Sequence, residues 1–228
     1  MKRSILFDTE TTGFDPDQGD RIIEIAAIEL IDDLPTTNYY HVMVHPERDI
    51  PAEATKVHGF RIEALEGAPK FPEIADGFLE FIGDAPMIAH NARFDFKFVN
   101  AELQKCGRAP LDYASRAIDT VEMARKKYPG MPASLDALCR RFNIDLSQRG
   151  THNALLDCKL LAEVYVELMG GRQRGLGLAG PSRSRSIAEA GDMLANRTPR
   201  KMALPNAEEL AAHTAFVDGL KDPVWRRD

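Results

Sequence analysis

The sequence contains few of the residues that form disulfide frameworks or zinc sites. Only three cysteines, Cys106, Cys139 and Cys158, occur in 228 residues, and no two of them form a CxxC pair. An odd number of cysteines without that spacing favours neither kind of cross-link. We therefore expect a reducing, cytoplasmic compartment.

Long apolar runs are also missing. No segment approaches the roughly 20 apolar residues that a membrane-spanning helix needs, and the first apolar stretch ends already at Asp8. We expect neither a membrane span nor a signal peptide. Hydrophobic residues make up 44% and charged residues 28%, which is ordinary for a globular chain and excludes collagen-like, coiled-coil and wholly disordered classes.

Basic residues are outnumbered by acidic ones in most of the chain. The formal net charge of −6 argues against a protein that binds nucleic acid through a broad basic face. The balance is −9 for residues 1–170 but +3 for residues 171–228. The chain also becomes rich in Gly, Ser and Arg after Gly170. We interpret 171–205 as a flexible linker between a domain at 1–170 and a C-terminal segment at 206–228.

The hydrophobic pattern of the first 170 residues predicts an α/β fold. The expected strands are 4–9, 22–31, 38–45 and 86–90. The expected helices are 72–82, 95–105, 120–127, 134–142 and 154–169. Three closely spaced strands followed by strands and helices in alternation favour a mixed sheet, which begins as an antiparallel meander and carries helices packed on it.

Two carboxylates meet at the end of the first predicted strand. Asp8 and Glu10 are two residues apart, so their side chains face the same side of the strand. Such a pair of like charges is unfavourable unless a cation lies between them, and oxygen ligands suit Mg²⁺ or Mn²⁺. A plain polar strand end followed by a turn is the alternative interpretation of DTETTG.

Two later segments offer further candidates. Asp95, in HNARFDFKFV, falls at the start of a predicted helix, where the helix dipole alone could explain a carboxylate. His152 and Asp157, in THNALLD, are five residues apart and would lie on different faces of one helix. His152 therefore belongs to a loop or first turn, which suits a mobile base, whereas the helix fixes Asp157 for a metal. An ordinary surface histidine is the alternative. Asp112 and Asp119 have no comparable setting.

FDTETTGF, HNARFD and the H-x4-D spacing, in this order, resemble the three motifs of the DnaQ-like DEDDh 3'-5' exonucleases. The resemblance covers residues 4–169, with a weaker one at 208–227, and is strongest to the proofreading subunits of bacterial replicative DNA polymerases. Asn153 stands where the tyrosine subtype of the superfamily has Tyr, so that subtype does not fit. The resemblance implies a ribonuclease H-like, mixed five-stranded sheet flanked by helices.

The resemblance also implies four metal-binding carboxylates and a general base, which is His152. The carboxylates, which would hold two divalent cations, Mg²⁺ or Mn²⁺, are Asp8, Glu10, Asp95 and Asp157. Glu53 and His58, in PAEATKVHG, match positions that contact the 3'-terminal nucleotide together with Asp8, Glu10 and Asp157. For His58 a favourable place at a helix C-terminus is the alternative. The implied reaction is two-metal hydrolysis that releases mononucleotides from a DNA 3' end.

The C-terminal tail has features of a segment that brings the first domain to its DNA substrate. Gln173, Leu176 and Leu178 form a Q-x-x-L-x-L pattern similar to the motifs with which bacterial polymerase subunits bind the sliding clamp. A helix is expected at 207–220, and large apolar groups on so short a segment favour anchoring to a partner. These groups include Leu210, Phe216 and Trp225. By resemblance the partner is the replicative polymerase alpha subunit, although the helix could instead pack on the front domain.

Two other functions also fit the sequence. An exoribonuclease of the same superfamily fits the same motifs, because nothing in the sequence explicitly recognises a 2'-hydroxyl. A non-catalytic scaffold that joins polymerase and clamp is the other. The presence of all four acids and the histidine speaks against a scaffold, since a relic site would not need to keep them.

Overall fold

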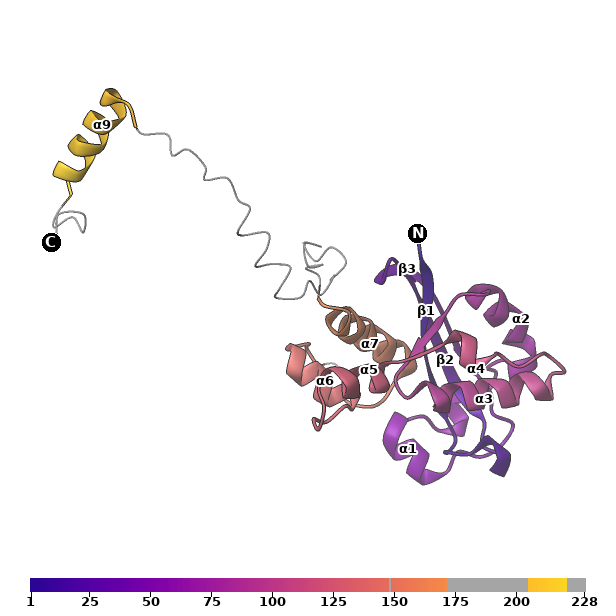
Figure 1. The fold of residues 1–228 in the computed structure, drawn as a ribbon. Coiled ribbons are helices and arrows are strands. Elements are labelled where there is room, and N and C mark those ends of the chain that lie inside the picture. The colour runs from indigo at the N-terminus through magenta and orange to yellow at the C-terminus, as the bar shows by residue number, and fades with distance from the viewer. Residues whose placement is uncertain (148, 172–204, 221–228) are drawn as a thin grey trace. The chain divides into compact units, whose positions relative to one another are not determined.

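The computed structural model describes residues 1–147, 149–171 and 205–220 (Figure 1). The chain divides into two compact units, Met1–Leu176 and Gly177–Asp228, and each is described by itself. Among the described residues, no helix has both the length and the apolar character that crossing a membrane requires.

A five-stranded sheet of order β3-β2-β1-β4-β5 organises the first unit. β1 (Arg3–Thr11), β2 (Ile22–Ile31) and β3 (Leu34–Met43) form an antiparallel meander. β4 (Met87–Ala89) and β5 (Ala117–Asp119) continue the sheet as parallel neighbours. The predicted mixed sheet is confirmed. The hydrophobic pattern did not indicate β5, which has only three residues and ends in Asp119.

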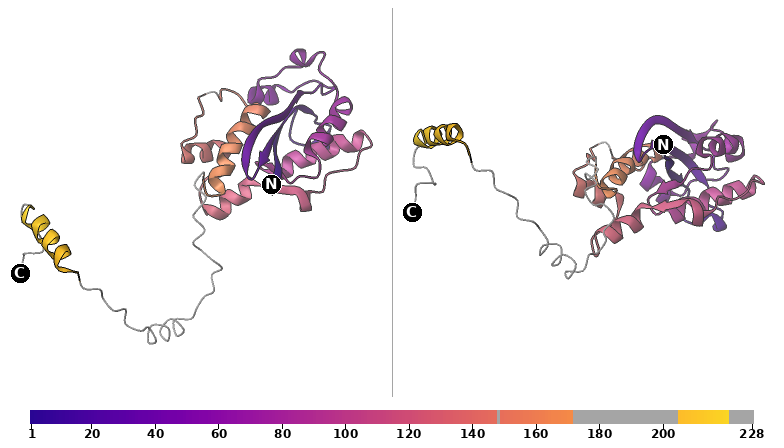
Figure 2. Two further views of the ribbon diagram at one scale, coloured as in Figure 1. Left: turned by 90° about the horizontal axis from the view of Figure 1, so that it is seen from above. Right: turned by 45° about the horizontal axis from the view of Figure 1, so that its top comes forward.

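Each face of the sheet has its own apolar core, because successive side chains of a strand point to opposite faces. On one face, Ile5 and Phe7 of β1 pack with α2 (Phe71–Ile82) and α3 (Ala92–Lys105). On the other face, Leu6 packs with residues of three later helices, which Figure 2 shows on the opposite side of the sheet from α2 and α3. These helices are α5 (Thr120–Lys127), α6 (Leu135–Phe142) and α7 (Ala154–Leu168).

The two predicted starts that differ most from the structure do so for local reasons. β3 begins at Leu34 rather than at residue 38, because Asp32 and Asp33 adopt positive φ (50° and 68°) and close a tight hairpin directly after β2. α3 begins at Ala92 rather than at residue 95, because Asn91 (φ 70°) turns the chain directly after β4. The hydrophobic pattern did not indicate three short elements, which are η1 (Pro16–Gln18), η2 (Ile62–Leu65) and α4 (Tyr113–Arg116). α1 (Ala52–His58) has no predicted range, but it ends at His58 before Gly59, as the alternative for that histidine required.

In the second unit, α9 (Ala207–Asp218) is described by itself. A capping box begins it, in which Asn206 and Glu209 each accept a hydrogen bond from the other's backbone N–H (2.9 Å each). The helix predicted at 207–220 is thus confirmed with an earlier end. Leu210 and Phe216 are exposed by 53% and 66%. The other predicted partner contacts, Gln173, Leu176, Leu178 and Trp225, lie outside the described residues.

Candidate active site

The end of β1 forms one wall of a pocket of about 480 Å³. Asp8 and Glu10 point from the same face of the strand, with Ala26 and Glu24 of β2 as their register partners. Asp95, His152 and Asp157 line the same pocket, which we call the catalytic pocket. Three sequence motifs that lie far apart in the chain therefore meet at one place.

Asp95 is fixed to β1 by hydrogen bonds that the sequence did not indicate. Its Oδ1 accepts from the backbone N–H (3.0 Å) and the hydroxyl (2.8 Å) of Thr9. The side chain lies in the first turn of α3 and is 2% exposed. A charge held only by the helix dipole would not need these contacts, so Asp95 belongs to the pocket.

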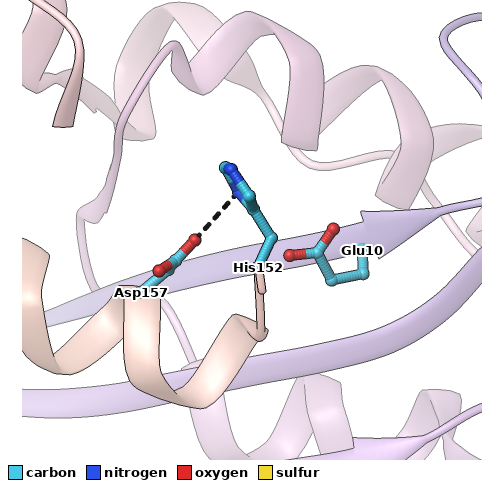
Figure 3. Close-up of side chains that lie close together, drawn as sticks. All are labelled: Glu10, His152 and Asp157. Atoms are coloured by element: carbon cyan, nitrogen blue, oxygen red, sulfur yellow. Dashed lines mark ion pairs between the residues drawn. The ribbon is translucent and has the colours of Figure 1, made fainter. Parts of the chain in front are cut away.

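His152 and Asp157 are divided between loop and helix as their spacing predicts. Asn153 caps α7 by accepting a hydrogen bond from the backbone N–H of Leu156 (3.0 Å), which places His152 just before the helix and Asp157 in its first turn. The imidazole is 47% exposed, and its Nδ1 lies 3.2 Å from Oδ2 of Asp157. Figure 3 shows both side chains close to Glu10, and one ligand atom of each residue lies within 4.8 Å of the others.

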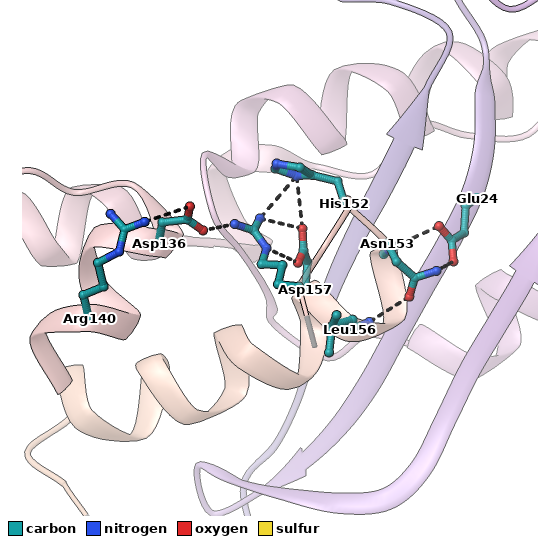
Figure 4. A network of polar contacts seen from close by, with 9 residues as sticks. Glu24, Asp136, Arg140, His152, Asn153, Leu156 and Asp157 are labelled. Carbon is teal, nitrogen blue, oxygen red and sulfur yellow. Dashed lines mark hydrogen bonds and ion pairs between the residues drawn. The ribbon is translucent and has the colours of Figure 1, made fainter. Parts of the chain in front are cut away.

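Arg149 is a cation at the centre of this network that the sequence analysis missed. Its guanidinium donates to both oxygens of Asp157 (2.8 Å each), contacts Asp136 of α6, and lies 3.2 Å from Nδ1 of His152. Figure 4 labels these three partners within the network. The side chain is only 9% exposed. Such a two-pronged contact is the strong form of an arginine–carboxylate pair. A loop arginine belongs to no periodic pattern, so no sequence signal could have found it.

Glu24 of β2 is a second missed residue, and its carboxylate is fully buried. It accepts hydrogen bonds from the side-chain amide of Asn153 (2.8 Å) and the backbone N–H of Ala154 (3.0 Å), both at the start of α7, and contacts Nε2 of His41 (2.7 Å). A carboxylate at a helix N-terminus is favourable. Glu24 therefore fixes the end of α7 from which Asp157 projects.

Asp119 has a structural role that the sequence did not indicate. It caps α5 and also accepts hydrogen bonds from the backbone N–H groups of Asn91 (3.3 Å) and Ala92 (3.0 Å). These contacts hold the turn that leads into α3. Asp112 caps α4 through the backbone N–H of Ala114. Both aspartates support the structure, and Asp119 supports the turn that positions Asp95.

Burial makes three of the four acids of the catalytic pocket resist ionisation. Burial, with the charges of Asp95 and Glu10 added to it, raises the pKa of Asp8 well above its usual range. Burial also raises the pKa of Glu10 to about 8 and that of Asp95 to about 7. Burial raises the pKa of Asp157 too, but hydrogen bonds from Arg149 and His152 outweigh it and bring that pKa below its ordinary value. A cluster of oxygen donors that repel one another fits a hard divalent cation.

The metal-free protein should become less stable as the pH rises. Glu10 and Asp95 have higher pKa values folded than unfolded, so the folded chain binds more protons between about pH 4 and pH 8. The free energy of unfolding must then fall across this window. We expect the melting temperature in EDTA to decrease from about pH 5 to about pH 8, and excess Mg²⁺ to raise it most at the higher pH. A melting temperature in EDTA that increases over the same range would contradict the raised pKa values of Glu10 and Asp95.

Glu53 and His58 come to the pocket from α1. His58 is 3% exposed, and its Nδ1 accepts from the backbone N–H of Phe60 (3.0 Å). Its Nε2 is buried and has no hydrogen-bond partner among the residues that the structure describes. A buried nitrogen without a partner is costly, and a ligand could satisfy it. Glu53 pairs with Lys56 (2.9 Å) at the rim. Phe14, which the sequence analysis also missed, is 83% exposed beside the same pocket.

Comparisons with known proteins agree with this geometry. The family model described as exonuclease matches residues 5–165. A DNA polymerase III subunit epsilon of Rickettsia felis is 45% identical over 226 residues, which cover 96% of each chain. The DNA polymerase III subunit epsilon of Escherichia coli is 37% identical over 229 residues, which cover 96% of this chain and 93% of the relative.

Two solved structures share the fold. Exonuclease X, in complex with 5' overhanging duplex DNA, is 28% identical with a TM-score of 0.58, over 74% of this chain and 91% of that one. The nuclease domain of 3'hExo, a DEDDh family member bound to rAMP, is 18% identical with a TM-score of 0.63, over 74% and 92%. The predicted ribonuclease H-like fold is confirmed. Because the family model spans most of the chain, and the pocket joins the segments that it matches, the chain belongs to the exonuclease family.

Proposed function

We propose that this exonuclease removes nucleotides, mismatched ones above all, from DNA 3' ends as the proofreading subunit of a replicative polymerase. One observation carries the proposal: acids from three distant segments converge on a single pocket that also holds a half-exposed histidine. The relatives named DNA polymerase III subunit epsilon, which match almost the whole chain, support the polymerase context.

The metal site follows from the donor set. Asp8, Glu10, Asp95 and Asp157 would hold two divalent cations, Mg²⁺ or Mn²⁺. Such cations, when bound, supply a hydroxide nucleophile and neutralise charge on the leaving oxygen. Thr9 holds Asp95 directly, and Glu24 holds the start of α7, from which Asp157 projects.

His152 is the general base in this proposal. It lies in a loop and keeps half of its side chain in solvent, so water can reach it. An imidazole accepts a proton near neutral pH, and Asp157 orients it through Nδ1 (3.2 Å). The pocket, at about 480 Å³, has the size of a small-ligand site, and His58 and Glu53 would position the 3'-terminal nucleotide in it.

The remaining residues would deliver the substrate. In this proposal residues 1–170 are the exonuclease domain, 171–205 a flexible linker, and 206–228 the segment that binds the polymerase alpha subunit. The exposure of Leu210 and Phe216 on α9 supports the anchor. Gln173, Leu176 and Leu178 would bind the sliding clamp. A tether of this kind raises the local concentration of an acidic domain that binds DNA weakly by itself.

Digestion of a 3'-mismatched primer annealed to a template tests the function. With Mg²⁺ we expect release of mononucleotides, faster from the mismatched than from the matched end, and no release in EDTA. Fragments cut inside the strand, or release that persists in EDTA, would overturn the proposal. A matched RNA primer in parallel tests the alternative, because preferential cleavage of RNA would identify an exoribonuclease.

A further inference from the structure

A second and larger pocket adjoins the catalytic pocket. Its volume is about 960 Å³, and its walls come mainly from α5, the start of α6 and the loop between them. Asp8, His90, His152 and Asp157 line both pockets. Asp8, His152 and Asp157 therefore stand at the boundary between the two pockets.

The boundary position of the catalytic residues fixes the direction of a bound DNA strand. Hydrolysis from a 3' end adds the oxygen of water to the phosphorus of the last nucleotide and breaks the bond to the 3'-oxygen of the preceding one, which leaves with a proton. Given the proposed function, the last nucleotide occupies the catalytic pocket beside Glu53 and His58. The preceding nucleotides must then leave the boundary on its other side, which is where the second pocket lies.

The charges of the second pocket suit a phosphate chain. Arg93 of α3 and Arg125 of α5 are exposed along it, and neither forms an ion pair with any residue in the described part of the chain. Two of its carboxylates are already engaged: Asp119 accepts backbone hydrogen bonds, and Asp136 pairs with Arg149. Apart from the acids of the catalytic site, Glu122 is then the one carboxylate among the described residues of this pocket that could offset the charge of the two arginines.

The walls also include aromatic and apolar side chains. The ring of Tyr113 lies under the Arg93 guanidinium, 5.6 Å from its carbon to the ring centroid, and Met131 is 51% exposed. Arginines that track phosphates, with an aromatic ring beside them, are typical of single-strand binding sites. We propose that the second pocket binds the DNA strand on the 5' side of the cleaved phosphate, with Arg93 and Arg125 contacting its phosphates.

Two substrates separate this role from catalysis. The 5'-p-nitrophenyl ester of thymidine monophosphate carries no phosphate on the 5' side of the cleaved bond, whereas a single-stranded DNA decamer would place several phosphates in the second pocket. In the full chain, the double variant Arg93→Ala/Arg125→Ala should raise KM for the decamer about tenfold and KM for the ester less than about twofold. The slope of log KM against log salt for the decamer should decrease by about 0.7 for each phosphate that an arginine no longer neutralises.

Arg108→Ala is the matched control, since Arg108 is an exposed arginine paired with Asp76 and does not line either pocket. Its KM for both substrates should stay within about twofold of wild type. An unchanged KM of the double variant for the decamer, or equal changes for decamer and ester, would overturn the inference and leave the proposed function standing. Failure of the wild-type protein to hydrolyse either substrate would overturn both.

Discussion

Replacing Asp8 by Asn should lower the rate of nucleotide release by about a thousandfold or more. Asp8 lies among Glu10, Asp95 and Asp157 at the boundary of both pockets. The amide keeps the shape of the carboxylate but removes its charge, which weakens the hold on a cation. Stabilisation by bound cations is worth several kcal/mol, and each factor of ten in rate corresponds to about 1.4 kcal/mol. Single-turnover digestion of the mismatched primer measures the loss.

Two further measurements distinguish this effect from unfolding. The Asp8→Asn variant should bind Mn²⁺ more weakly in a calorimetric titration, yet melt at the same or a higher temperature in EDTA, because one repelling charge is gone. Asp145→Asn is the matched control, because Asp145 is an exposed aspartate that accepts hydrogen bonds from Ser147. A wild-type rate in the Asp8→Asn variant would exclude Asp8 from the metal site.

Replacing Glu24 by Ala should lower the free energy of unfolding by about 3 kcal/mol and also reduce activity. The buried carboxylate accepts from Asn153 and Ala154, and each buried donor left without a partner costs about 1–3 kcal/mol. Since α7 begins at these residues, His152 and Asp157 lose their support as well. Thermal unfolding should show a melting temperature lower by about 6–12 °C.

Glu24→Gln should recover part of the stability, because its single amide oxygen can still accept one of the two hydrogen bonds. Glu163→Ala is the matched control on α7: Glu163 is exposed, and the change in unfolding free energy should stay within about 0.5 kcal/mol. If Glu24→Ala lowered the unfolding free energy by less than about 1 kcal/mol, other contacts would have to hold the start of α7.

Much of the fold was predictable from local pattern. The meander followed from three apolar segments in close succession, and β2 and α5 have the predicted bounds. Asp8 and Glu10 share a face because a strand alternates with period two. His152 and Asp157 separate into loop and helix because five residues do not return to the same helical face. In each case the deciding interactions act within a few residues of the chain.

The sequence by itself thus determined four of the five strands, the longer helices, the acids with their order, and the family. Only the tertiary structure decided that Thr9 fixes Asp95, that Glu24 anchors the start of α7, and that Arg149 joins Asp157 to His152. It also decided that two pockets meet at the catalytic residues. For Arg149 the physical reason is that a loop has no periodic pattern, and for the other two contacts it is distance along the chain. Thr9 and Asp95 are 86 residues apart, and Glu24 and Ala154 are 130 apart, so no local periodicity encodes their contact, which forms only when the sheet and its helices pack.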